Sequence, residues 1–115
     1  MKVAIIGSRN LTDIDISEYV PDETKEIISG GANGIDTLAE QYADKHGICK
    51  TIIKPEYEKY KRNAPLMRNK EIVEKSDFIV ALWDGQSRGT KNVIDYAKKL
   101  KKKIEIYVFS KHNGE

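Results

Sequence analysis

The sequence predicts an α/β domain, a three-layer structure in which a parallel sheet of about five strands carries helices on both faces. Three observations support this fold class. Short apolar runs with the length of buried strands alternate along the chain with segments of helical periodicity. Neither a long linker nor an internal repeat interrupts this alternation. At 115 residues the chain has the size of one domain, which we expect to span residues 1–115.

The five short apolar runs are expected to be the strands of the sheet. Most of them are bounded by glycine, proline or charged residues. The expected strands cover residues 2–6, 26–29, 50–54, 78–82 and 104–109. Numbered along the chain, they are expected in the order 3-2-1-4-5, so that the first and fourth strands are neighbours at the centre of the sheet. A polar tail follows the last strand.

Helices are predicted from apolar residues that recur every three or four positions. The clearest helix begins near Ile35 and stops at Gly47, a residue type that commonly ends helices. Its apolar face combines Ile35, Leu38, Ala39, Tyr42 and Ala43. Another long helix is expected over residues 90–101, and a short one around residues 17–20.

A further helix is expected over residues 65–75, and it carries an unusual amide. Leu66, Asn69 and Val73 share one face of this helix, so Asn69 stands where an apolar residue is expected. Asn69 either caps a buried backbone group or points into a ligand crevice. We favour the crevice, because the neighbouring Arg68 adds a second group that can bind an anion.

The composition is typical of a globular protein. Hydrophobic residues make up 39% of the chain and charged residues 33%. The net charge of +2 is too small to indicate a nucleic-acid-binding protein by itself. The densest charge lies at the end of the last predicted helix, where cations complement the helix dipole. It consists of Lys98, Lys99, Lys101, Lys102 and Lys103.

The sequence also bears on location and on cofactors. Cys49 is the single cysteine, so an internal disulfide is impossible and a reducing compartment is favoured. The apolar run over residues 3–6 is too short for a secretory signal, and no run approaches the length of a transmembrane helix. We therefore expect a cytoplasmic protein with no membrane contact. No cluster of cysteine and histidine predicts a metal site, and no cofactor is expected.

Three glycine-containing loops follow predicted strands. They are Gly7-Ser8-Arg9, residues 30–34, and residues 83–90 with the sequence Trp-Asp-Gly-Gln-Ser-Arg-Gly-Thr. In open α/β sheets, ligands bind at the carboxyl ends of the strands, where these loops would meet. The last loop enters a helix, whose first N–H groups attract anions, and Arg88 adds a planar group suited to phosphate. The sequence therefore predicts a phosphate-binding crevice flanked by Arg9 and Arg88.

Several residues in these loops allow two interpretations. The glycines at positions 30–34 form either a tight turn or a phosphate cradle, and neither G-x-G-x-x-G nor a P-loop is present. Asp36 either complements the helix dipole or accepts a hydrogen bond from a ribose hydroxyl. Trp83 either packs under a helix or stacks on a base.

Four stretches taken together resemble the SLOG superfamily, in its branch related to YspA and YpsA. They are residues 5–9, 30–36, 68–69 and 83–90. The superfamily includes the DNA-processing protein DprA and the Lonely Guy phosphoribohydrolases. The resemblance covers nearly the whole chain, and it implies a Rossmann-like sheet and a nucleotide or nucleotide-derived ligand.

The resemblance also implies which residues line the ligand site. By similarity they are Gly7, Ser8, Arg9, Gly30, Gly31, Asp36, Arg68, Asn69, Ser87, Arg88, Gly89 and Thr90. The loops themselves add Gly34, Trp83 and Asp84 as expected ligand-binding residues.

The chain departs from the Lonely Guy enzymes at their catalytic motif, P-G-G-x-G-T-x-x-E. Here no proline precedes the glycines, and Val93 stands at the position of the catalytic glutamate. No catalytic residue can therefore be assigned, and we expect a small nucleotide-binding protein of the sensor type.

Two alternatives stay open. The first is a phosphoribohydrolase acting on nucleoside monophosphates, in which Asp36 or Asp84 supplies the carboxylate. The second, less favoured, is the binding of single-stranded DNA, as in DprA, with the lysines and with Tyr57 and Tyr60 supplying charge and stacking. The resemblance also implies a possible homodimer.

Overall fold

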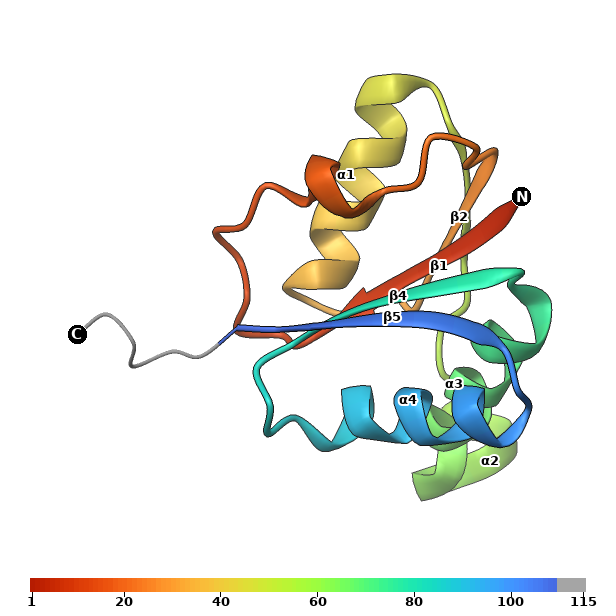
Figure 1. The fold of residues 1–115 in the computed structure, drawn as a ribbon. Helices are drawn as coiled ribbons and strands as arrows, with labels where there is room; N and C mark the ends of the chain where they lie inside the picture. The colour runs from red at the N-terminus through yellow and green to blue at the C-terminus, as the bar shows by residue number, and fades with distance from the viewer. Residues whose placement is uncertain (110–115) are drawn as a thin grey trace.

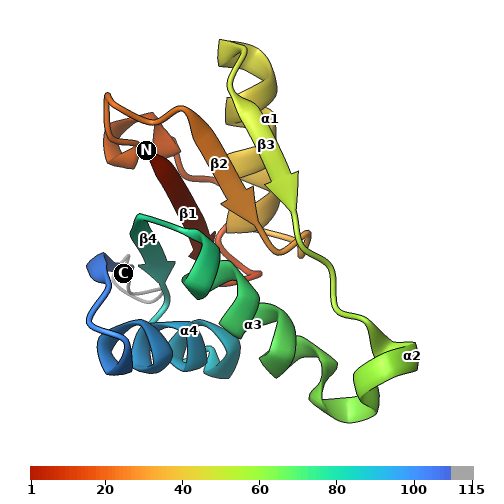
Figure 2. The ribbon, with the colours of Figure 1, turned by 90° about the vertical axis from the view of Figure 1, so that its right-hand side faces the viewer.

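The computed structural model describes residues 1–109, and these contain one five-stranded, all-parallel sheet. Its strand order is β3-β2-β1-β4-β5, as the sequence predicts. Figure 2 shows β3, β2, β1 and β4 side by side. The polar tail expected at residues 110–115 lies outside the described residues. The strands are β1 (Lys2–Gly7), β2 (Glu26–Ser29), β3 (Cys49–Ile52), β4 (Phe78–Trp83) and β5 (Lys103–Val108).

Helices cover both faces of this sheet, which confirms the predicted three layers and gives a Rossmann-like fold (Figure 1). α1 (Ile35–His46) and the 3₁₀ helix η1 (Ile16–Tyr19) lie on one face. α3 (Ala64–Lys75) and α4 (Arg88–Lys99) lie on the other. The short elements α2 (Tyr57–Tyr60) and η2 (Lys61–Asn63) precede α3.

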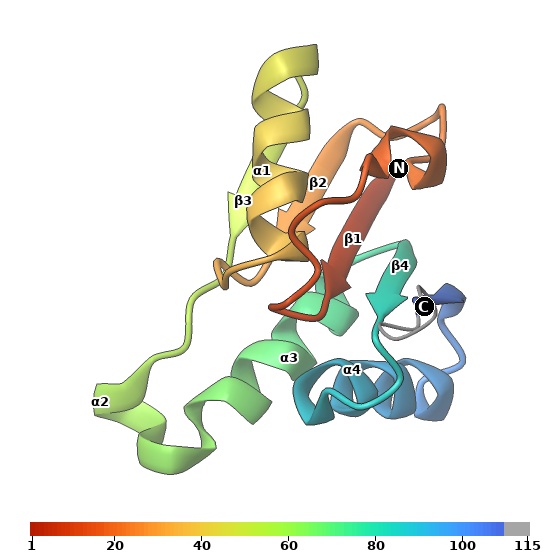
Figure 3. The same ribbon diagram turned by 90° about the vertical axis from the view of Figure 1, so that its left-hand side faces the viewer.

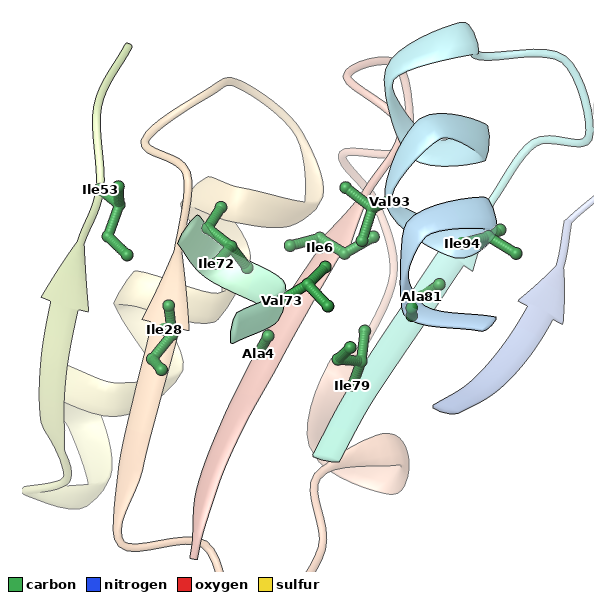
Figure 4. Close-up of a cluster of buried hydrophobic side chains, with 11 residues drawn as sticks. Ala4, Ile6, Ile28, Ile53, Ile72, Val73, Ile79, Ala81, Val93 and Ile94 are labelled. Carbon is green, nitrogen blue, oxygen red and sulfur yellow. The ribbon is translucent and has the colours of Figure 1, made fainter. Parts of the chain in front are cut away.

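The two central strands supply both hydrophobic cores, because successive side chains of a strand point to opposite faces. In β1, Ala4 and Ile6 pack toward α3 and α4, whereas Val3 and Ile5 pack toward α1. Figure 4 shows the first of these clusters, in which Val73 of α3 and residues of α4 lie over the sheet. This double burial explains why β1 and β4 are continuous apolar runs.

Several boundaries differ from the sequence-based ones. β1 and β4 each extend one residue further than expected, because Gly7 pairs with Leu82 of β4 and Trp83 pairs with Val108 of β5. α4 begins at Arg88, two residues early, because Ser87 rather than Gly89 occupies its N-cap position. β3 ends at Ile52, two residues before the expected end.

Leu66 differs in burial from the two residues that share its face of α3. Asn69 and Val73 are buried as that pattern requires, but Leu66 is 45% exposed. The helical pattern identifies the face correctly. It does not show how far the neighbouring helix extends along that face.

Among residues 1–109, no helix has the length and apolar character needed to cross a membrane.

The chain takes a left-handed backbone conformation after both α1 and α4, with a glycine at one end and a lysine at the other. Gly47 follows α1 at φ 66°, and Lys101 takes the corresponding left-handed conformation after α4 at φ 59°. There the Lys101 N–H bonds the Lys98 carbonyl and the Lys102 N–H bonds the Ala97 carbonyl. Glycine adopts this conformation without the penalty that other residues meet.

We expect Lys101→Gly to raise the free energy of unfolding by about 0.5–1 kcal/mol and Gly47→Ala to lower it by about 1 kcal/mol. A methyl group at Gly47 would meet nothing within 4 Å, so its effect would report the backbone alone. Urea unfolding of both variants is the measurement. A Lys101→Gly protein less stable than wild type would contradict this account of the helix end.

Candidate functional site

A cavity of about 470 Å³ lies at the carboxyl ends of β1 and β4. In Figure 3 these strand ends point toward the junction of α3 and α4, with the loop after β1 close by. The two central strands continue into crossovers on opposite faces of the sheet, which is where open α/β sheets bind ligands. Twelve of the expected ligand-binding residues line the cavity: Gly7, Ser8, Arg9, Gly30, Asp36, Arg68, Asn69, Asp84, Ser87, Arg88, Gly89 and Thr90.

Ser8 joins the loops at the base of the cavity. Its buried Oγ accepts a hydrogen bond from the Asp84 N–H at 3.0 Å and is hydrogen-bonded to the Ser87 hydroxyl at 2.8 Å. Its backbone N–H donates to the Leu82 carbonyl, and its carbonyl accepts from the Ile35 N–H. One residue after β1 thus fixes both the loop after β4 and the start of α1.

Asp84 organises the loop that leads into α4. Its Oδ1 accepts hydrogen bonds from the N–H groups of Gln86 and Ser87, both at 2.8 Å, and from the Ser87 hydroxyl at 3.0 Å. Partial burial alone would raise the pKa of Asp84, but these hydrogen bonds outweigh it and lower the pKa to about 2. The carboxylate therefore stays ionised and holds the loop.

The first turn of α4 lies in the wall of the cavity. Ser87 occupies the N-cap position without a side-chain cap hydrogen bond, and Arg88, Gly89 and Thr90 follow it in the lining. The first N–H groups of a helix have no intrahelical partner and carry the positive end of the helix dipole. The exposed Arg88 guanidinium adds a full charge beside them.

Arg68 and Asn69 connect the loops across the cavity. Arg68 donates from Nη1 to the Gly30 carbonyl and from Nε to Oδ1 of Asn69. Asn69 in turn donates to Oδ1 of Asn92 at 3.0 Å and to the Gly89 carbonyl at 3.5 Å. Asn69 therefore lines the cavity, and the backbone group that it bonds belongs to the exposed Gly89 and is not a buried one.

Asp36 is a buried carboxyl group in the cavity wall. Its Oδ2 accepts a hydrogen bond from the Ala32 N–H at 3.1 Å, while its buried Oδ1 has no hydrogen-bond partner among the described residues. Burial raises the pKa of Asp36 to about 6, although the Ala32 hydrogen bond and the charge of Arg68 act to lower it. Asp36 therefore loses its proton near pH 6, well above the range of an ordinary aspartate.

Three expected ligand-binding residues support the cavity from outside its lining. Trp83 packs against the core beside α4, and its Nε1 donates to the Ser87 carbonyl at 3.0 Å. Gly34 adopts φ +74°, and a side chain there would collide with the carbonyl oxygens of Ser8 and Arg9. Gly31 also has a positive φ of 74°. These residues shape the loops.

The sequence-based prediction missed the apolar part of the lining. Pro65 and Leu66 form it on the side of α3, and the core residues Ile6, Ile72 and Val93 complete it. The placement of Leu66 one turn before Asn69 is the signal that could have identified it. Asn10 and Ala32 also line the cavity.

Two other expectations concern features away from the cavity. The lysines near residue 100 lie at the opposite end of α4 from its first turn, and Lys102 donates to the Ser76 carbonyl at 2.8 Å. Within residues 1–109, no three histidine, cysteine or acidic side chains gather in a way that could hold a metal ion.

We expect Ser8→Ala to lower the free energy of unfolding by about 1–3 kcal/mol, because the Ser8 side chain is buried and its loss removes the acceptor of the Asp84 N–H. Ser17→Ala is the matched control, since Ser17 is exposed and bonds only Asp15 nearby in sequence. The control should change stability by less than about 0.5 kcal/mol in urea unfolding. Equal losses of stability in both variants would show that the hydrogen bonds of Ser8 stabilise the fold no more than those of an exposed serine.

The raised pKa of Asp36 predicts pH-dependent stability. The pKa of Asp36 in the folded protein is about 6, whereas that of an unperturbed aspartate is 3.8. The resulting stabilisation of the folded state is fully present below about pH 3.8 and is lost as the pH rises through about 6. It amounts to roughly 3 kcal/mol.

Asp36→Asn should therefore be more stable than wild type above about pH 6, and the difference should shrink toward zero below about pH 4. Urea unfolding of both proteins across this range measures the effect. A stability difference that does not vary with pH would contradict the raised pKa.

Comparison with known proteins gives no match. No family model matches the chain, and neither a curated protein nor a solved structure matches it. The chemistry of the cavity is therefore the basis for assigning a function.

Proposed function

We propose that this protein binds a nucleotide or a nucleotide-derived ligand in the cavity at the ends of β1 and β4, and that it acts as a ligand sensor. The ligand phosphate would lie at the first turn of α4, beside Arg88. The observation that carries the proposal is the meeting of this helix N-terminus with Arg9, Arg68 and Arg88 in one cavity. N–H groups and guanidinium groups together are well suited to phosphate.

Two further observations support a nucleotide as the ligand. The cavity volume of about 470 Å³ lies within the range of sites that hold small organic ligands. The four stretches that resemble the SLOG superfamily contribute most of the lining, and we propose membership of that superfamily on the same basis. The single cysteine, Cys49, is exposed and unpaired, which favours a cytoplasmic location.

A second candidate function is hydrolysis of the N-glycosidic bond of a nucleoside monophosphate, and Asp36 favours it. A buried carboxyl group with a raised pKa can act as a general acid near neutral pH. In that reaction water adds to C1′, the C1′–N bond breaks, and the departing base takes up a proton. Release of free base from AMP or GMP, abolished by Asp36→Asn, would support hydrolysis. Absence of release at high protein concentration would rule it out for those two nucleotides.

We expect Arg88→Ala to weaken nucleotide binding by about tenfold or more, because it removes a charged donor from the phosphate position. A thermal-shift panel with AMP, GMP, ADP-ribose, NAD and a short DNA strand identifies the ligand class. A ligand at about 100 times its dissociation constant adds about 2.7 kcal/mol, which raises the melting temperature by several degrees.

Arg62→Ala is the matched control for this panel, since Arg62 is exposed and does not line the cavity. It should leave the shift unchanged. Arg88→Ala that folds normally and keeps the wild-type shift would disprove the proposed phosphate position. An equal loss in both variants would indicate a general charge effect.

A further inference from the structure

Leu66 is an apolar side chain that the packing of α3 leaves open toward the cavity. It is 45% exposed, although it shares a helix face with the buried residues Asn69 and Val73. α3 and α4 run alongside each other in the same direction, because Asn69 bonds Asn92 and Glu74 bonds Tyr96. Asn69 already lies level with the first turn of α4. One turn earlier, Leu66 therefore extends past the start of α4, and that helix cannot cover it.

The cavity beside Leu66 has an apolar part that a phosphate group would not use. Pro65 lies next to Leu66 in the lining, and the buried side chains of Ile6, Ile72 and Val93 continue the apolar surface inward. Phosphate is strongly hydrated and gains nothing from such a surface. A flat ring gains both dispersion contacts and the release of water from apolar area.

We propose that Leu66 and Pro65 form the platform for the planar base of the ligand, so that the ligand class is a nucleoside phosphate rather than a phosphorylated sugar. This inference rests on the proposed phosphate site at the start of α4. The base would lie against the first turn of α3, and the phosphate against the first turn of α4. The bonded pair of Asn69 and Gly89 lies between these two turns.

The test is calorimetric titration of the wild type and two variants with AMP, GMP, UMP and ribose 5-phosphate. Leu66→Asn should weaken binding of the nucleotides by about five- to tenfold, the effect of losing roughly half the burial of a leucine side chain. Binding of ribose 5-phosphate should stay the same. Leu100→Asn is the matched control, because Leu100 is 40% exposed at the far end of α4, and it should change neither affinity.

The possible failures are distinguishable. Wild type that binds ribose 5-phosphate as tightly as all three nucleotides would overturn the platform and leave the phosphate site intact. An unchanged nucleotide affinity in Leu66→Asn would also overturn the platform and leave the phosphate site intact. If neither class of ligand binds, the proposed function fails and the platform with it.

Light scattering and thermal unfolding complete the test. Leu66→Asn should fold like wild type, because its side chain is half exposed. Its molar mass in solution should also equal that of wild type. A dimeric wild type that dissociates in Leu66→Asn would show that a second copy of the chain covers Leu66, and this would overturn the proposal.

Discussion

The hydrogen bonds of Ser8 fix the loop after β4 and the start of α1 beside the central strands. The Ser8 hydroxyl lies between β1 and the loop after β4, and its backbone reaches both Leu82 and Ile35. Within a buried site, hydrogen bonds of this kind are effective because an unmade one leaves a desolvated group behind. The close approach also requires Gly34, since a side chain there would collide with the Ser8 carbonyl. These contacts fix the loops that line the cavity.

The sheet and its order follow from patterns that the sequence displays directly. The runs over residues 78–82 and 2–6 are apolar on both faces, which only a central strand of a covered sheet requires. Boundaries were less predictable, because the start of α4 depends on the turn that Asp84 builds and not on apolar periodicity. The exposure of Leu66 was not predictable for a related reason. Periodicity identifies a helix face, but only the packed structure shows where the partner helix begins.

In the site, too, the features set by local sequence patterns were predictable, and those set by tertiary packing were not. Most of its lining could be named in advance, because glycine loops after parallel strands must meet at one edge of the sheet. The ionisation states of its two aspartates could not be predicted from the sequence. Asp84 accepts three hydrogen bonds and has a pKa of about 2, whereas Asp36 is buried with an unpartnered Oδ1 among the described residues and a pKa of about 6. Burial and hydrogen-bond partners set this contrast, and both arise from tertiary packing.

Two features that a well-packed protein normally avoids lie at this cavity, beside the start of a helix. Asp36 has a buried oxygen without a hydrogen-bond partner among the described residues, and Leu66 is 45% exposed. The first turn of α4, like that of every helix, has N–H groups without intrahelical partners. Under the proposed function, each of the three would contact a different part of one ligand. A hydroxyl or amino donor suits Asp36, a flat ring suits Leu66, and an anion suits α4. Because local rules are most often broken where a protein binds or reacts, their coincidence favours a single ligand that contacts all three.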